Sequence, residues 1–239
     1  MPSPRAPRAP RAPRALPLVQ SVNIGRLAEV RSAKKLTSGI DKVPVEGPVE
    51  VRAPGPKRGG LGSGLLGDEL GDARHHGGDT QAVYAYSREE LDHFERLLGR
   101  DLPNGAFGEN LTTTGLVVSD AVVGERWRVG ETLVLQVTAP RIPCSTFRAW
   151  IDVKGWLRTF TEQNRTGTYL AVVEPGPVAA GDTVEVISRP DHGVRVSDIF
   201  LAIMVRHDLL PSLLPAGDDL EPETLEAAKK AARDADGPL

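Results

Sequence analysis

The sequence predicts a mostly β domain with a barrel-like sheet, a few helices and a short helical extension at its C-terminal end. Glycine and proline supply 25 and 20 of the 239 residues, well above their usual combined share of about 12%. This composition favours many turns and short strands. Short apolar runs lie between these residues, and the last segments of helical composition follow the final run.

The chain divides into three predicted parts. Residues 4–15 repeat the triplet Pro-Arg-Ala, which cannot bury apolar surface, so residues 1–17 are expected to be a disordered tail. The first segment with core composition begins at Leu18. We expect the main domain over residues 18–190 and the helical extension over residues 191–239.

Charge and cysteine content limit the function classes. The formal net charge is −3, and four arginines without any acid in residues 1–16 contribute +4, so the rest carries −7. An acidic domain argues against nucleic acid as the main partner. Cys144 is the single cysteine, which excludes an internal disulfide and a cysteine-rich zinc site. With no apolar run of about 18 residues, we expect a cytoplasmic protein without a membrane partner.

Strand patterns recur along the domain. Apolar residues alternate, or form short buried runs bounded by turn residues, in six segments. These segments are residues 18–22, 45–51, 82–86, 132–138, 169–173 and 184–187. Gly181 and Asp182 form a predicted turn before the last of them.

Helix signals are fewer. Ser87 and Glu90 form a predicted capping box, and Gly99 stands at the expected C-terminal end of that helix. A second helix is expected over about 152–163. In the extension, Ser197 is the expected cap of one helix, and residues 222–232 have the composition of another.

A first polar cluster precedes the strand at residue 82. It comprises Gly67-Asp68, Asp72, His75, His76, Gly77 and Gly78. Paired glycines allow the backbone to approach a ligand closely, and an imidazole can donate to an anion or to a metal-bound oxygen. The alternative is an ordinary glycine turn with an exposed histidine.

A second cluster is the glycine-bounded loop over residues 107–116. Asn110 and Thr112 offer neutral donors and acceptors suited to the polar edge of a heterocycle, and Glu109 can fix the loop through backbone amides. A hydrogen-bonded turn without a ligand is the alternative.

A third cluster holds the thiol. Pro140 and Pro143 are expected to make the segment rigid, and Arg141 can stabilise a thiolate on Cys144. A thiolate is a nucleophile and a soft metal ligand that suits molybdenum or copper(I). A lone cysteine is also commonly a small buried apolar residue.

Together, these clusters resemble the MOSC family, named after the C-terminal domain of molybdenum cofactor sulfurase, and its bacterial YiiM-like branch in particular. The resemblance covers about residues 18–188. It depends on Gly67-Asp68, His76-Gly77-Gly78, residues 107–111, Val123-Gly124-Glu125, Leu135-Gln136-Val137 and residues 140–144. Two features depart from the branch: Thr168 follows Gly167 where relatives often have tryptophan, and the helical tail is shorter and more acidic.

The resemblance implies a mostly β domain that binds the molybdenum cofactor (Mo-molybdopterin), with Cys144 as the protein ligand to the metal. It also implies reduction of N-hydroxylated small molecules, including N-hydroxylated purines, to amines. The implied catalytic residues are Cys144, Asn110 and His76. The implied cofactor contacts are Lys42 and Arg141 at the phosphate, then Arg165 and Thr112.

Redox chemistry of this kind needs electrons that ordinary side chains cannot cycle. No flavin or nicotinamide motif is apparent in the sequence, so an external electron-donor reductase is an expected partner, and a homodimer is a further expectation. Two alternatives stay open. The domain can carry the cofactor, or a persulfide on Cys144, without turnover. It can also be a cysteine hydrolase with Cys144 and His76 as nucleophile and base, which the expected lack of a helix start at the thiol disfavours.

Overall fold

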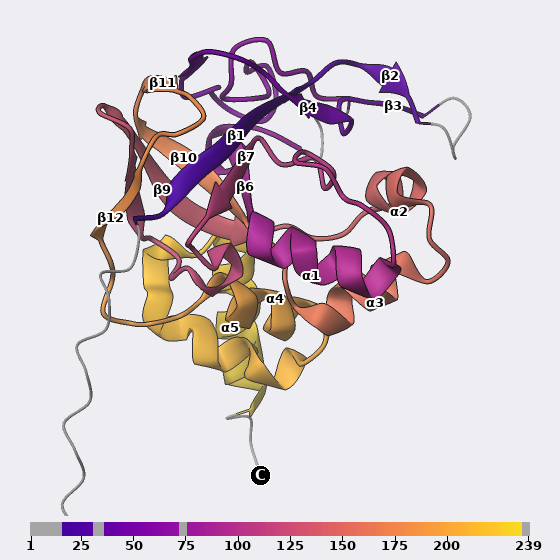
Figure 1. Ribbon diagram of the computed structural model, residues 1–239. Coiled ribbons are helices and arrows are strands. Elements are labelled where there is room, and N and C mark those ends of the chain that lie inside the picture. The colour runs from indigo at the N-terminus through magenta and orange to yellow at the C-terminus, as the bar shows by residue number, and fades with distance from the viewer. Residues whose placement is uncertain (1–15, 31–35, 72–75, 236–239) are drawn as a thin grey trace, which may run out of the picture.

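A computed structural model describes residues 16–30, 36–71 and 76–235, and its main element is an eight-stranded sheet (Figure 1). The strand order is β12-β8-β9-β10-β6-β7-β1-β4, and every neighbouring pair is antiparallel except β6 with β7. The strands are β1 (Leu18–Gly25), β4 (Lys42–Pro44), β6 (Val83–Ser87), β7 (Leu111–Thr114), β8 (Arg126–Val129), β9 (Leu133–Pro140), β10 (Thr168–Glu174) and β12 (Val184–Ser188).

Two short ribbons accompany this sheet. One pairs β5 (Val49–Val51) with β11 (Gly176–Val178), and the other pairs β2 (Ala28–Glu29) with β3 (Thr37–Ser38). The predicted strand over 45–51 is therefore shorter than expected, because Gly47, at φ +75°, turns the chain between β4 and β5.

The sheet curls until its two ends meet. The amide of Val19 in β1 donates to the carbonyl of Asp182, just before β12, over 2.8 Å, and the amide of Val184 donates to the carbonyl of Pro17 over the same distance. Strand β4 lies beyond β1, so the barrel is partly open. The predicted barrel-like, mostly β fold is confirmed.

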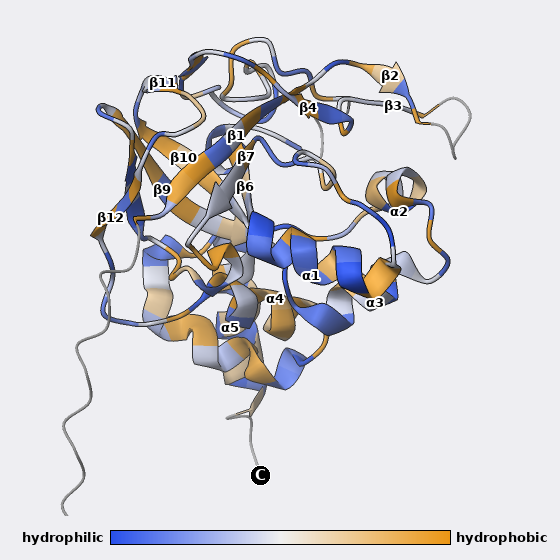
Figure 2. Cartoon of the chain, in the orientation of Figure 1, coloured by the Kyte–Doolittle hydropathy of each residue, from blue (hydrophilic) through white to orange (hydrophobic). Residues whose placement is uncertain are grey.

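The inside of the curled sheet is the main hydrophobic core. Its buried side chains come from alternate positions of the strands, as in Leu133, Leu135 and Val137 of β9, and they pack with Trp127 of β8. Figure 2 shows this apolar character along β9 and β10. The period-two pattern of the sequence therefore identifies this face of the sheet.

The described residues also form five α-helices and three 3-10 segments. The α-helices are α1 (Arg88–Leu98), α2 (Ser145–Ile151), α3 (Trp156–Gln163), α4 (Val196–Met204) and α5 (Pro222–Ala235); the 3-10 segments are η1 (Asp79–Gln81), η2 (Val118–Asp120) and η3 (His207–Asp219). For α1, the predicted boundaries are correct: the Ser87 side chain accepts from the amide of Glu90, and Gly99 ends the helix at φ +63°.

Two helix predictions need correction, and one helix was not predicted. The helix expected over 152–163 starts only at Trp156, because Asp152 adopts φ +53° and ends α2. Helix α2 itself, which begins directly after Cys144, was not predicted. In the extension, Arg195 rather than Ser197 caps α4. The predicted helix at residues 222–232 is confirmed and continues to Ala235.

The C-terminal helices form a small layer below the sheet (Figure 1). Their apolar side chains, including Ile199, Leu213 and Ala228, pack around Val123 in a hydrophobic cluster that is separate from the main core. Within the described ranges, none of the helices is both long and apolar enough to cross a membrane. All but two residues of the predicted disordered tail, 1–17, lie outside the described residues.

Candidate active site

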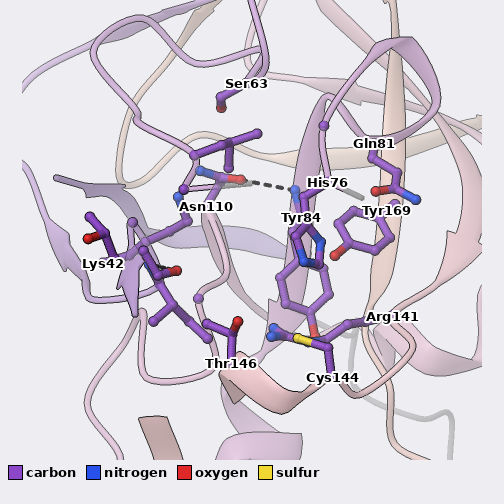
Figure 3. Close-up of a pocket in the computed structure, with 18 of the residues that line it drawn as sticks. Lys42, Ser63, His76, Gln81, Tyr84, Asn110, Arg141, Cys144, Thr146 and Tyr169 are labelled. Atoms are coloured by element: carbon purple, nitrogen blue, oxygen red, sulfur yellow. Dashed lines mark hydrogen bonds between the residues drawn. The ribbon is translucent and has the colours of Figure 1, made fainter. Parts of the chain in front are cut away.

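A cavity of about 220 Å³ opens between the loop after β9, the glycine-rich segment before β6 and the chain between β3 and β4 (Figure 3). It gathers five of the residues singled out in the sequence, although they are far apart along the chain. These are Lys42, His76, Asn110, Arg141 and Cys144. Two others, Thr112 and Arg165, do not line it.

The thiol of Cys144 is half-buried at this cavity. Burial by itself raises the pKa of a thiol, but a hydrogen bond with His76, the charge of Arg141 and the backbone amide of Phe147 together lower the pKa of Cys144 to about 6. The thiolate is therefore the main form at neutral pH. Thiolate is also the form that binds metals and attacks electrophiles.

Helix α2 contributes to this environment. Cys144 is its N-cap residue, in an extended conformation at φ −119°, and the first helical turn follows immediately. The expectation that no helix start lies at the thiol was therefore wrong. Pro143 does not prevent this start, because proline restricts the residues before it and not the helix that begins after it.

Arg141 is buried and fixed by three groups. Its Nη1 donates to the carbonyl of Phe107, and its guanidinium carbon lies 3.9 Å from the ring centroid of Phe147 and 5.2 Å from that of Tyr84. Cation–π contacts of a desolvated guanidinium are stabilising. They hold a permanent positive charge beside the sulfur of Cys144.

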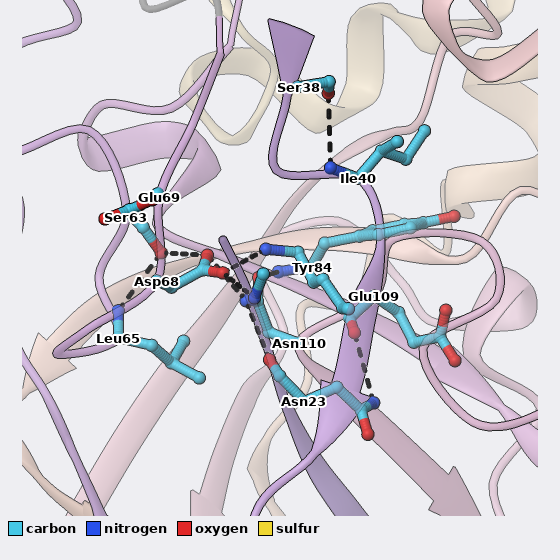
Figure 4. Close-up of polar contacts among 12 residues, drawn as sticks. Asn23, Ser38, Ile40, Ser63, Leu65, Asp68, Glu69, Tyr84, Glu109 and Asn110 are labelled. Atoms are coloured by element: carbon cyan, nitrogen blue, oxygen red, sulfur yellow. Dashed lines mark hydrogen bonds and ion pairs between the residues drawn. The ribbon is translucent and has the colours of Figure 1, made fainter. Parts of the chain in front are cut away.

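Lys42 lies at the start of β4, and its ammonium group forms a buried ion pair with Asp68. The same carboxylate accepts from the amide of Gly25 over 2.8 Å, from the Ser63 hydroxyl over 2.7 Å and from the Asn110 side chain over 2.9 Å; Figure 4 shows Asp68 between Ser63 and Asn110. Burial lowers the pKa of Lys42, and the Asp68 carboxylate opposes that change. Asp68 is thus the centre of a saturated polar network.

The side chain of Asn110 belongs to this network. Its Oδ1 accepts from the amide of Tyr84 over 3.1 Å, and its Nδ2 donates to Asp68 and to the carbonyl of Asn23. An amide has two N–H donors and one carbonyl acceptor. Because these groups already have partners, Asn110 holds β6 and the Asp68 loop in place beside the cavity.

Glu109 fixes the preceding loop, as predicted. Its carboxylate accepts from the backbone amides of Gly105, over 2.6 Å, and Phe107, over 3.0 Å. The Thr112 hydroxyl also donates to it, over 2.9 Å, and accepts from the side chain of Asn23. Thr112 therefore lies fully buried beneath the site and not on its wall.

Arg165 lies shortly before β10 and does not line the cavity. Its carbonyl accepts from the Tyr86 hydroxyl, and its guanidinium contributes to the electrostatic environment of Glu90. The sequence order, in which Arg165 precedes a strand beside the cavity, does not determine on which side of the strand the side chain lies.

The further side chains that line the cavity include Gln81, Tyr84 and Tyr169. The two tyrosine rings pack with centroids 5.1 Å apart, from the adjacent strands β6 and β10. Both tyrosines lie in strands that the sequence predicts, but one-dimensional alternation does not separate a cavity wall from a core face. Gln81 had no sequence signal.

Gly77 brings the His76 segment close to its neighbours. It adopts φ +80°, and a Cβ at this position would lie 2.5 Å from the carbonyl oxygen of Gly62. Only glycine fits both requirements. The first polar cluster is therefore more than an exposed turn, although Asp72 and His75 lie outside the described residues.

The MOSC domain family model matches residues 72–185. The uncharacterized protein YflK of Bacillus subtilis (strain 168) is 34% identical over 179 residues, which cover 74% of this chain and 76% of YflK. The chain belongs to the MOSC domain family. Its fold and sequence are those of a bacterial YiiM-like MOSC protein.

Other relatives agree with this membership. YiiM of Escherichia coli (strain K12) is 34% identical over 133 residues, 53% of this chain and 57% of YiiM. A Gibberella moniliformis protein named Reductase is 29% identical over 223 residues, which are 87% of this MOSC chain but only 37% of that longer protein.

Solved structures share the fold. The crystal structure of YiiM from Geobacillus stearothermophilus superposes with a TM-score of 0.70 at 24% identity, covering 90% of this chain and 98% of that one. YiiM from Escherichia coli gives a TM-score of 0.66, also at 24% identity, covering 94% and 95%.

Proposed function

We propose that this MOSC protein is an oxidoreductase that holds a molybdenum cofactor through Cys144 and reduces N-hydroxylated compounds, such as N-hydroxylated purines, to amines. The observation that carries the proposal is the thiol with a pKa of about 6 at the cavity, beside His76 and Arg141. The relative named Reductase supports the broader class of redox enzyme.

The donor set of the cavity fits a metal that arrives with ligands of its own. Among the described residues, no group of three or more histidine, cysteine, aspartate or glutamate side chains is placed to hold a metal ion. A bare ion would find one thiolate, whereas a metal already bound to a pterin dithiolene needs only that one further ligand. Thiolate sulfur suits a soft metal centre.

The positive groups divide into two roles. Arg141 donates through Nη1 to the carbonyl of Phe107, and its fork of five N–H donors leaves others for the cofactor phosphate. Lys42 already faces the carboxylate of Asp68. In our proposal, Arg141 therefore contacts the phosphate, and Lys42 and Asn110 position the loops around it.

The proposed reaction is R–NHOH + 2 e⁻ + 2 H⁺ → R–NH₂ + H₂O, in which the N–O bond breaks. When bound, the cofactor supplies the two electrons, and an external electron-donor reductase restores them. His76 borders the cavity next to the thiol and is placed to deliver a proton to the departing hydroxyl. The rings of Tyr84 and Tyr169, which are tilted by 39° to each other, form the aromatic wall against which the substrate lies.

Two other functions use the same thiol. A carrier would hold the cofactor, or a persulfide on Cys144, without reducing a substrate. A cysteine hydrolase would use the Cys144–His76 pair, and the start of α2 at the thiol removes the objection to it that the sequence raised. The hydrolase and the persulfide carrier give Arg141 no anionic partner other than the thiolate, whereas a cofactor carrier would use Arg141 as the reductase does and differs from it only in turnover.

The test is anaerobic purification of the full chain, followed by metal analysis, fluorescence of the oxidised pterin, and turnover with N-hydroxyadenine and benzamidoxime under a chemical reductant. We expect about one molybdenum per chain and formation of the amine. Cys144→Ser should lose molybdenum and turnover while the protein stays folded.

Three outcomes decide between the functions. Molybdenum with no turnover of any N-hydroxylated substrate, together with release of the pterin to an apo-enzyme, would favour the carrier. Ester or amide hydrolysis by metal-free protein would favour the hydrolase. Full activity of Cys144→Ser would reject Cys144 as the ligand.

A further inference from the structure

Gln81 lies at the wall of the cavity and carries an amide oxygen that has no partner among residues 16–30, 36–71 and 76–235. It is the last residue of η1 and lines the cavity with His76 and Tyr169, and Figure 3 shows its amide beside the ring of Tyr169. Among the described residues, its Oε1 is buried and accepts no hydrogen bond. A buried acceptor without a donor is destabilising, so at a cavity it indicates a place for a ligand donor.

Hydrogen bonds fix the backbone of Gln81, which carries this side-chain carboxamide. The backbone N–H of Gln81 donates to the carbonyl of Gly78 over 2.9 Å. Within η1, the carbonyl of Thr80 accepts from the Thr138 hydroxyl over 2.6 Å, and the Thr80 hydroxyl donates to the Glu221 carboxylate over 3.0 Å. The last side-chain torsion of glutamine is soft. Rotation there can direct either amide atom into the cavity while the backbone stays in place.

A carboxamide presents a carbonyl acceptor next to an N–H donor. Its complement is an N–H donor next to a nitrogen acceptor, which is the amidine edge. Adenine-type bases have this edge, and glutamine pairs with it through two hydrogen bonds; amidoximes offer a comparable open-chain pair, an N–H donor next to the oxime oxygen. The ring of Tyr169 lies beside Gln81 (Figure 3), and Tyr84 lines the same cavity and packs against Tyr169. Aromatic rings stack on flat bases.

We propose that Gln81 is the specificity-determining residue of this cavity and that it selects flat ligands with an amidine edge. The inference rests on the proposed function, because it describes how a substrate would be chosen there. It states that one side chain, that of Gln81, makes the cavity bind N-hydroxylated amidines more tightly than other N-hydroxylated compounds.

The experiment measures binding and not turnover. Calorimetry with the full-length, cofactor-loaded protein compares adenine with 6-methylpurine, in which a methyl group replaces the amino group. Wild type should bind adenine about tenfold more tightly, the usual size of one such base discrimination. In Gln81→Leu, the two affinities should become equal. Gln20→Leu, an exposed position on β1, is the matched control and should keep the preference.

A second arm separates the sources of the edge. It compares benzamidoxime with acetophenone oxime, which again replaces an amino by a methyl group. A Gln81-dependent preference in the adenine pair alone assigns a purine-type ligand; one in the oxime pair alone assigns an open-chain ligand. Either result supports the proposal.

The proposal is overturned if wild type shows no preference in either pair, or if Gln81→Leu retains the wild-type preference. Gln81→Leu should melt no lower than wild type, because it removes a buried acceptor that has no partner among the described residues. Failure of the proposed function is a separate result: it appears as absence of molybdenum or of any reductase turnover in the wild-type protein.

Discussion

Lys42 and Asp68 form an ion pair that is closed to solvent, with side-chain exposures of 4% and 0%. Such pairs contribute little net stability when intact, but loss of one partner leaves the other charge buried without its counter-ion. The pair joins β4 to the loop before β6, and Asn110 joins the same loop to β7. It therefore determines the shape of one side of the cavity.

Lys42→Met should lower the free energy of unfolding of cofactor-free protein by about 3–5 kcal/mol, because Asp68 is left buried and charged. Urea unfolding at pH 7 measures this. Arg26→Met is the control: Arg26 pairs with Glu69 at the surface, at 3.7 Å and 76% exposed, and its loss should cost less than about 1 kcal/mol. Equal effects of the two substitutions would contradict the buried role of Lys42.

Cys144 should react with iodoacetamide in metal-free protein with a midpoint near pH 6, because the pKa of its thiol is lowered to about 6. The thiolate forms as the pH rises through that value, and the alkylation rate should reach its plateau by about pH 7. His76→Ala removes the hydrogen bond and should move the midpoint upward. A wild-type midpoint at the ordinary thiol value of about 8.5 would exclude this environment.

Glu90→Gln should make stability less dependent on pH. Burial raises the pKa of Glu90 above its ordinary value of 4.5, so the stability it contributes is present below the unfolded-state value and is lost as the pH rises through the folded-state pKa. Each unit of that difference is worth about 1.4 kcal/mol. Above about pH 4.5, where the carboxyl ionises in the unfolded state first, the variant should therefore gain stability relative to wild type in urea unfolding; a constant difference would refute it.

Gly77→Ala should destabilise the protein by more than a substitution that only meets an unfavourable φ. Gly193 supplies the comparison, since it adopts φ +69° with no atom within 4 Å of where a Cβ would lie, whereas a Cβ on Gly77 would meet backbone at 2.5 Å. Gly193→Ala should cost about 1–2 kcal/mol. Gly77→Ala should cost more and should also raise the alkylation midpoint of Cys144, because the clash displaces His76.

The sequence predicted the strands and α1 because their signals are local. Alternating residues such as Leu133 and Leu135 mark one face of a strand, and Ser87 and Gly99 mark the ends of a helix. The boundaries of α2 and α3 depend on Asp152, which adopts φ +53°. Aspartate tolerates this left-handed conformation but does not require it, so the break follows from how the neighbouring Ile151 and Val153 pack against the aromatic core. Tertiary structure therefore decides where these helices end.

The candidate site was predictable where motif and chemistry coincide, as at Cys144, His76 and Arg141. Its remaining features depend on contacts between distant segments. Lys42 was expected to face a phosphate, but Asp68, 26 positions away, is its partner. Thr112 and Arg165 have suitable side chains but do not line the cavity, and Thr112 is fully buried. Gln81 lacks a signal because its unpaired oxygen is apparent only once the cavity exists.

The contact that joins the two ends of the sheet also bears on how the protein is made. Residues 17–19 form backbone hydrogen bonds with residues 181–184. A chain emerging from the ribosome therefore exposes its first strand long before the segment that closes the barrel has been synthesised. Contacts of such high sequence separation form slowly, and open strand edges promote aggregation in the meantime. The early strand β1 can pair first with β7, at Thr112 to Thr114, which shields one of its edges until translation reaches the closing segment.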